Sequence, residues 1–184
     1  MLLIYDGKTT ADAPVPRTGG VPLVPEGFVW PLCRECDGAM QFLAHLPLPF
    51  GLAVVFFCQN DPGMCDDWSA TAGGNAAFLF DGERLSPAAV PAEGETDLGA
   101  VTALRLHPEH SPALERVLGR LGGEPDWLQG DETPVCRSCS TRMAFAAELE
   151  EGHDFATSAN FGGGGRGYVF TCRPCAKAAF LWQH

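Results

Sequence analysis

Eight cysteines are the residues whose type and spacing could carry chemistry in this sequence, and they fall into two groups of four. The second group reads Cys136-x2-Cys139-x32-Cys172-x2-Cys175. Two C-x-x-C pairs are typical of a structural zinc site, because a tight turn delivers two thiolates to one ion and four thiolates complete its tetrahedral shell. We therefore predict that this group binds one Zn²⁺.

The first group has a looser pattern, Cys33-x2-Cys36-x21-Cys58-x6-Cys65. We predict a second Zn²⁺ here, which makes two ions per chain. If Cys65 is not the fourth ligand, the alternatives are Asp61, Asp66 and His45. Four protein ligands leave no open coordination position, so both sites are expected to be structural rather than catalytic.

A catalytic role for the cysteines is the competing interpretation. Cys172-Arg173-Pro174-Cys175 has the form of a thiol-oxidoreductase motif, but that motif needs a βαβ context and only nine residues follow Cys175. The glycine run Gly162–Gly167 lacks the Gly-Lys-Ser/Thr of a phosphate-binding loop. No nucleophile–base arrangement stands out, so we expect no enzyme. A thiol-redox or hydrolytic enzyme is kept as the alternative of another class.

The chain also repeats itself. Residues 19–46 and 122–149 align without a gap at an offset of 103, with 12 of 28 positions identical, and the two C-x-x-C pairs coincide. Such self-similarity predicts two homologous halves. The first repeat, with its core at 19–80, lies with a linker in 1–110; a helix and the second repeat, with its core at 122–182, lie in 111–184. We expect the halves to form one compact unit.

Alternating or short apolar runs predict strands in both halves. These runs lie at 40–46, 52–58, 76–80, 102–107, 143–149, 167–172 and 178–182. A helix is predicted before the second repeat, with Ser111 as N-cap, Pro112 in the first turn and Gly122 at the end. Its apolar face consists of Leu114, Val117, Leu118 and Leu121. The expected fold class is α+β, mainly antiparallel β, with two pseudo-symmetric β-rich repeats.

Composition narrows the possible partners. The 184 residues are 46% apolar, which is enough for a packed core, and the formal charge of −11 argues against a nucleic-acid partner. No run of 18 apolar residues predicts a membrane span, and the start of the chain lacks the pattern of a signal peptide. We therefore expect a cytoplasmic protein, where cysteines bind metal more often than they form disulfides.

The same residues resemble the YwqG-like domain family. The likeness rests on Gly19–Pro25, Trp30-Pro31, Met40–Leu46, Leu121–Gln129 and Ala178–Gln183. It covers both halves and implies an architecture rather than a reaction. The sequence departs from that family at His45, where the pattern has Gln, and at Glu148.

A shorter likeness concerns the order Gly-Gly-x-Pro, C-x-x-C and Phe-Phe-Cys, which is similar to the programmed-cell-death-2 family of ribosomal-protein chaperones. This resemblance implies a newly made basic protein as partner. We predict a non-catalytic, zinc-stabilised protein-binding domain that captures a basic or extended segment at an exposed strand edge. An immunity-type or regulatory inhibitor is the first alternative.

Overall fold

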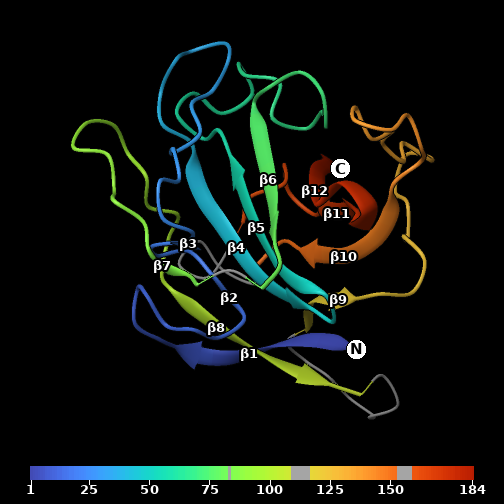
Figure 1. Cartoon of the computed structure of the whole chain (residues 1–184), viewed down its shortest axis with the longest axis horizontal. Helices are drawn as coiled ribbons and strands as arrows, with labels where there is room; N and C mark the ends of the chain where they lie inside the picture. The colour runs from blue at the N-terminus through green and yellow to red at the C-terminus, as the bar shows by residue number, and fades with distance from the viewer. Residues whose placement is uncertain (83, 109–116, 153–158) are drawn as a thin grey trace.

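A closed antiparallel barrel dominates the computed structural model, which describes residues 1–82, 84–108, 117–152 and 159–184 (Figure 1). The strand order around the barrel is β1-β8-β2-β4-β5-β6-β12-β11-β10-β9. The strands are β1 (Leu2–Lys8), β2 (Arg17–Thr18), β4 (Gln41–Leu48), β5 (Gly51–Phe57), β6 (Asn75–Phe80), β8 (Thr102–His107), β9 (Val117–Leu121), β10 (Ala144–Glu150), β11 (Arg166–Cys172) and β12 (Lys177–Gln183). A separate two-stranded sheet pairs β3 (Leu23–Val24) with β7 (Ser86–Pro87).

Two three-stranded meanders, β4-β5-β6 and β10-β11-β12, make up most of the wall. They join through β6 and β12, where Lys177 lies opposite Phe78, and β1 closes the circle by pairing with both β8 and β9. Each meander has an apolar inner face that a three-stranded sheet alone would leave in water. Closure buries both faces in one core, in which Phe57 of the first meander contacts Phe180 of the second.

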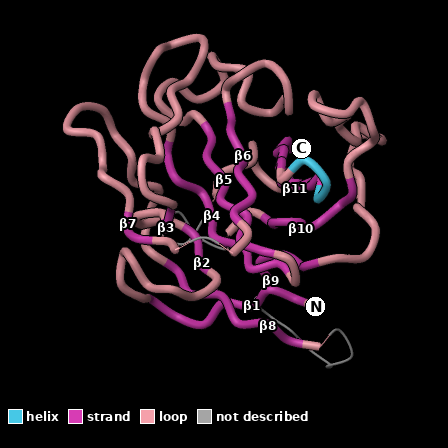
Figure 2. The backbone as a smooth tube through the Cα atoms, in the orientation of Figure 1, coloured by secondary structure: helices cyan, strands magenta, loops and turns pink. Residues whose placement is uncertain are grey.

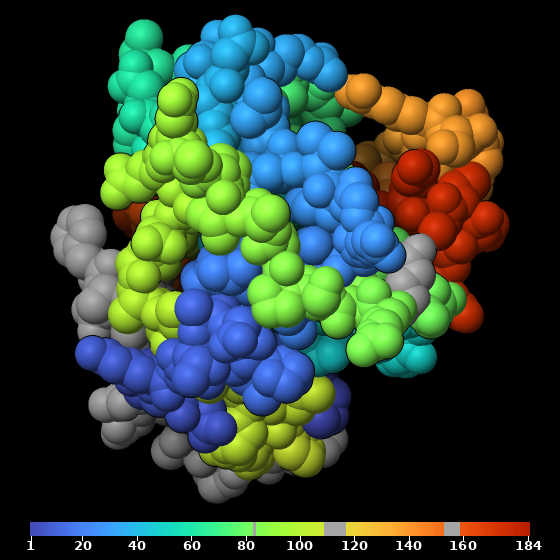
Figure 3. All heavy atoms as spheres, turned by 60° about the vertical axis from the view of Figure 1, so that its left-hand side comes forward, coloured from blue at the N-terminus to red at the C-terminus, as the bar shows by residue number. Residues whose placement is uncertain are grey.

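The segment between β6 and β8 packs on the outside of the first half. Its backbone accepts hydrogen bonds from Gln41 Nε2 at the Glu95 carbonyl and from the Phe42 N–H at the Thr96 carbonyl. The Ala88 N–H donates to the Pro22 carbonyl beside the β3–β7 pair. Figure 3 shows this yellow-green segment lying against the blue N-terminal segments.

Local backbone geometry matches between the halves at the offset of 103. A bulge interrupts β4 between Phe42 and Ala44, and another interrupts β10 between Phe145 and Ala147. Isolated bridges join Leu32 to Ala39 and Val135 to Arg142. The equivalent positions therefore share one local conformation, as their sequence similarity requires.

An arginine at the start of each repeat holds the turn that follows it. Arg17 is fully buried and donates hydrogen bonds to the carbonyls of Ala13, Gly19 and Val21. At the equivalent position Arg120 donates to the carbonyl of Glu124, which corresponds to Val21. These bonds satisfy backbone acceptors in a glycine turn that has no ladder partners of its own.

The residue opposite each arginine differs between the halves, but in both halves its side chain accepts a hydrogen bond from a loop N–H. His45 Nε2 accepts the Leu23 N–H at 2.8 Å, whereas Glu148 Oε2 accepts the Asp126 N–H at 3.1 Å and lies 3.3 Å from Arg120 Nη2. Both side chains are nearly inaccessible to solvent. The two departures from the YwqG-like pattern thus lie at one structurally equivalent position and act as acceptors for a loop amide.

The prediction of an α+β fold with a helix before the second repeat is wrong. Val117–Leu121 forms β9, which pairs with β1 on one side and β10 on the other. Over these five residues the spacing of the apolar side chains is compatible with a strand or a helix. Pairing with β1 and β10 on the two sides makes the segment a strand. The predicted positions Ser111, Pro112 and Leu114 lie outside the described residues. Figure 2 shows a single short helical turn, η1 (Arg173–Cys175), in the part of the chain described.

Gly119 makes the three-strand contact possible, which generates a stability prediction. Its φ is +142°, and a Cβ there would lie 2.1 Å from the Glu148 carbonyl oxygen. Gly122 also has a positive φ, +70°, but a Cβ would meet nothing within 4 Å. We expect Gly119→Ala to lower the free energy of unfolding by about 3 kcal/mol or more, and Gly122→Ala by about 1 kcal/mol. Equal losses in urea denaturation would contradict the close approach of β9 and β10.

His45 generates a second prediction, on pH. Burial and the neighbouring Arg17 guanidinium lower the pKa of this imidazole to about 3. The unfolded chain binds the same proton near pH 6.5, so stability is lost as the pH falls below about 6.5, by at most about 1.4 kcal/mol per pH unit. His45→Gln keeps an acceptor without a titration.

Denaturation of wild type and His45→Gln at pH 7 and pH 5 measures how much His45 contributes to the pH dependence of the free energy of unfolding. The contributions of the other titrating groups cancel in the comparison. We expect wild type to lose about 2 kcal/mol more than the variant. His184→Gln, at an exposed position, is the control and should behave like wild type. An identical pH slope for wild type and His45→Gln would show that the imidazole is not held neutral.

Candidate metal centres

The structure brings the first four cysteines together although their positions span more than thirty residues. Cys33 and Cys36 lie in the turn before β4, Cys58 directly follows β5, and Cys65 lies in the loop before β6. Their sulfur atoms all lie within 4.8 Å of one another, with 3.7 Å between Cys36 Sγ and Cys58 Sγ.

The second four cysteines meet in the same manner at the second meander. Cys136 and Cys139 precede β10, Cys172 is the last residue of β11, and Cys175 ends η1. All four sulfurs again lie within 4.8 Å of one another, and Cys139 Sγ and Cys172 Sγ are 3.6 Å apart. The turns that carry the two C-x-x-C pairs both contact the loop before β6. The Arg34 N–H donates to the Gly73 carbonyl, and Arg137 Nη2 donates to the Thr71 carbonyl.

The sulfur separations fit a metal ion and exclude disulfides. All eight cysteines are free, and a disulfide bond would bring two sulfurs to about 2.05 Å. A tetrahedron with metal–sulfur bonds of about 2.3 Å has edges of about 3.8 Å. The observed separations of 3.6 and 3.7 Å are close to that edge. Two metal ions are thus compatible with the two groups.

A tight turn aims the first pair of sulfurs in each group. The Asp37 N–H donates to the Cys33 carbonyl, and the Cys33 N–H donates to the Gly38 carbonyl, both at 2.9 Å. Asp37 takes a left-handed conformation with φ of +56°, and its counterpart Ser140 has φ of +58°. The same two hydrogen bonds recur between Cys136, Ser140 and Thr141, which shows that the C-x-x-C spacing encodes a local shape.

Hydrogen bonds to sulfur lower the pKa of one exposed thiol in each group. Burial raises the pKa of Cys36, but bonds from the Asn60 side chain and the Gly38 backbone outweigh it and lower the pKa to about 7. The hydroxyl and backbone of Thr141 lower the pKa of Cys139 to about 6. Asn60 and Thr141 were missed by sequence reasoning, because neither falls in the cysteine pattern.

Two other thiols in each group have a raised pKa. Burial, followed by the neighbouring thiols, raises the pKa of Cys58 to about 11 and that of Cys65 further. In the second group, contact with Cys139 and then burial raise the pKa of Cys175 to about 12. Four thiolates at these distances repel one another, so a cation must compensate them before all four can ionise.

The alternatives to Cys65 as fourth ligand do not enter the group. His45 lies on β4 and uses Nε2 to accept the Leu23 N–H, and neither Asp61 nor Asp66 belongs to a metal-binding cluster among the described residues. The Cys172-Arg173-Pro174-Cys175 segment likewise does not stand alone as a dithiol. Both of its sulfurs face Cys136 and Cys139.

No protein-family model and no curated protein sequence matches this chain. In the described ranges, no helix has the length and hydropathy needed to cross a membrane. The fold and the two four-thiol groups therefore define the class: a closed β-barrel domain with two candidate structural metal centres.

The metal centres generate a prediction on content and stability. We expect about two equivalents of zinc per chain in protein purified without added metal. Cys136→Ser and Cys65→Ser should each reduce this to about one and lower the melting temperature strongly, because metal binding contributes directly to folding.

Ser138→Ala is the matched control, since Ser138 lies in the same turn as Cys136 and Cys139 but supplies no ligand. It should keep both zinc equivalents, measured by elemental analysis of the folded fraction. Wild-type protein that holds no metal and forms disulfides would rule out both centres.

Proposed function

We propose that this chain is a non-catalytic protein-binding domain in which two zinc ions stabilise the barrel. The observation that carries the proposal is that each candidate centre already has four thiol ligands. A Zn²⁺ with four protein ligands has no free position for water or substrate, so it holds loops in place rather than activating a nucleophile.

The set of four sulfur donors favours zinc, and iron is the alternative metal. Tetrahedral four-sulfur sites in proteins hold zinc or iron, the latter in iron–sulfur centres. Iron centres absorb visible light, whereas Zn²⁺ has a filled d shell and none of these bands. A colourless protein with two equivalents of zinc supports the proposal, and a brown protein with iron contradicts it. Zinc bound to reduced thiolates also agrees with a cytoplasmic location.

Exposed apolar side chains beside the ligands are the surface we assign to the partner. Leu32 precedes Cys33 and is 58% exposed, and its equivalent Val135 precedes Cys136 and is 53% exposed. Met64, directly before Cys65, is 72% exposed. Large apolar residues held on rigid loops are suited to anchor a partner.

The charge of the chain favours a basic partner. The formal charge is −11, and each filled four-thiolate site lowers it by a further 2, to about −15. Long-range attraction to a basic segment would then raise the association rate at low salt. The resemblance to the ribosomal-protein chaperones points to the same kind of partner.

The expected mode of capture needs a correction. In the barrel every described strand has two neighbours, so no strand has a free edge along its whole length. Shorter unpaired stretches remain, because β2 pairs with β4 and β8 only at Arg17 and Thr18, and β6 pairs with β12 only through Phe78 and Lys177. The β3–β7 pair does have edges, but each of its strands has only two residues. We therefore propose that a partner binds mainly through side chains on the loops rather than by adding a full strand to the barrel.

Pull-down of basic proteins from a lysate tests this proposal. We expect retention at 0.05 M salt to fall strongly at 0.5 M, because the Debye length falls from about 14 Å to about 4 Å. Leu32→Ser and Met64→Ser should weaken retention about tenfold each. Val90→Ser, an exposed apolar residue in the segment between the meanders, is the control. Retention of acidic partners would contradict the proposal, and so would retention that changes neither with salt nor in the two loop variants.

A further inference from the structure

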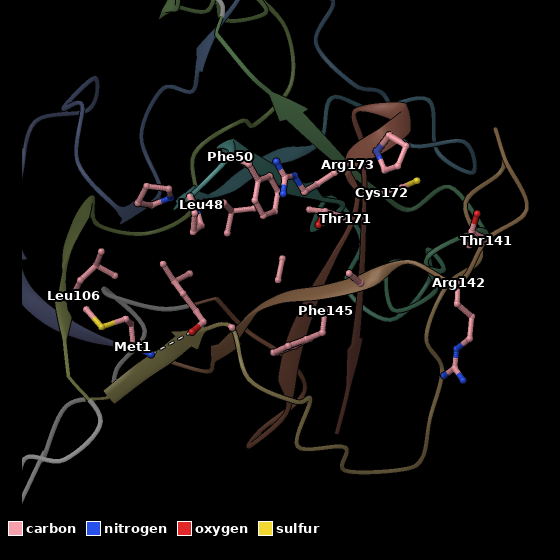
Figure 4. A pocket seen from close by; sticks show the side chains of 17 residues that line it. Met1, Leu48, Phe50, Leu106, Thr141, Arg142, Phe145, Thr171, Cys172 and Arg173 are labelled. Carbon is pink, nitrogen blue, oxygen red and sulfur yellow. Dashed lines mark hydrogen bonds between the residues drawn. The ribbon is translucent and has the colours of Figure 1, made fainter.

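One end of the barrel opens into an apolar pocket that plays no part in the proposed function. It lies where β4 and β8 end, β5 and β10 begin and β11 ends, and its volume is about 740 Å³ (Figure 4). The apolar lining includes Leu48, Phe50, Leu106 and Phe145. This size and lining are those of small-molecule sites, which often occupy the mouths of β-barrels.

The charge of this pocket is opposite to that of the whole chain. No aspartate or glutamate is among the described residues that line it, although the formal charge of the chain is −11. Arg173 and Arg142 supply two guanidinium groups to the lining. Arg142 is already paired with Asp131 at 2.5 Å, and the Met1 ammonium, which also lines the pocket, donates to the Leu121 carbonyl. Arg173 is therefore the guanidinium available to a ligand.

Arg173 lies at the edge of the apolar pocket. Its guanidinium lies 4.7 Å from the centre of the Phe50 ring, and Figure 4 shows both side chains at the same edge of the pocket. No ion pair joins Arg173 to a described carboxylate; Asp81, which borders the adjoining hollow with Arg173, forms none with it. The Thr171 side chain lines the same pocket and contributes a hydroxyl to its lining.

The backbone that carries Arg173 is held by the second metal centre. Arg173 begins η1, between the ligands Cys172 and Cys175, and Pro174 restricts the turn further. Cys172 itself lines the pocket. The guanidinium is therefore presented from a rigid turn, which reduces the entropy lost when it binds an anion.

We propose that the barrel mouth binds a medium-chain fatty carboxylate, with its hydrocarbon chain against Leu48, Leu106 and Phe145 and its head group on Arg173 and Thr171. An apolar cavity with Arg173 at its edge and no acidic side chain among its described lining residues is complementary to an amphipathic anion and disfavours an amphipathic cation. This site does not depend on the proposed protein partner, which would contact the loops.

Calorimetric titration with three twelve-carbon probes below their micelle concentrations tests the proposal. Dodecanoate should bind one per chain, dodecanol more weakly, and dodecyltrimethylammonium weakest of all. Arg173→Gln should weaken dodecanoate about tenfold or more, the usual effect of losing a charge-assisted hydrogen bond, and leave dodecanol unchanged. Ala144→Trp, at an exposed position in the lining, should block both.

Arg137→Gln is the matched control, because Arg137 adjoins a ligand of the same metal centre but does not line the pocket. It should bind dodecanoate like wild type, and the metal content of every variant should equal that of wild type. Absence of dodecanoate binding by wild type, equal binding of the ammonium probe, or unchanged binding by Arg173→Gln would each overturn the proposal. None of these outcomes bears on capture of a basic protein.

Discussion

Mutual repulsion of four closely spaced thiolates is the constraint on which the rest of this structure depends. Each group of sulfurs lies within 4.8 Å, and a cation is needed before all four can ionise. Once a metal ion is bound, it ties the turn before the first strand of a meander to the end of the second strand. In both halves it would also hold the connection to the third strand, through Cys65 before β6 and Cys175 before β12.

Barrel closure complements this local stabilisation. The core combines side chains from both meanders, and the turns beside both candidate metal centres contact the loop before β6. Neither meander alone could bury its inner face, so metal ions bound at the two centres would stabilise parts of one cooperative unit. Arg17, which is buried, and Arg120, which is partly exposed, donate to the glycine turns that enter each half. His45 and Glu148 each accept the next loop amide. Two different side chains at one equivalent position satisfy the same backbone requirement.

The acidic exterior and the cationic pocket point to two separate binding events. The proposed partner site combines an acidic chain with apolar side chains beside the metal loops, and it would attract a basic macromolecule at long range. The proposed ligand site has an apolar interior with Arg173 at its edge, and it would bury a short amphipathic anion. The second metal centre contributes to both features, because Val135 and Arg173 each adjoin one of its ligands.

Local pattern was enough to predict the two thiol groups and most of the strands. A C-x-x-C turn places two sulfurs side by side through hydrogen bonds within six residues, as between Cys33 and Gly38, so its spacing carries the information. The offset of 103 likewise revealed equivalent segments before any pairing was known. The choice of Cys65 over His45, Asp61 and Asp66 needed the structure, because it depends on where a loop of six residues returns.

Features that depend on contacts between distant segments could not be predicted from the sequence. Val117–Leu121 was predicted as a helix, and only the ladders with β1 and β10 make it a strand, since its apolar spacing suits either conformation. The closed order of strands follows from the β6–β12 and β1–β9 contacts, which no local motif specifies. The pocket is composed of strand ends from both halves of the chain. Sequence alone determined the two C-x-x-C turns and the repeats, because both appear as fixed spacings along the chain. Tertiary structure decided the fourth member of the first cysteine group, the closure of the barrel, the strand conformation of β9 and the pocket, because each depends on contacts between distant segments.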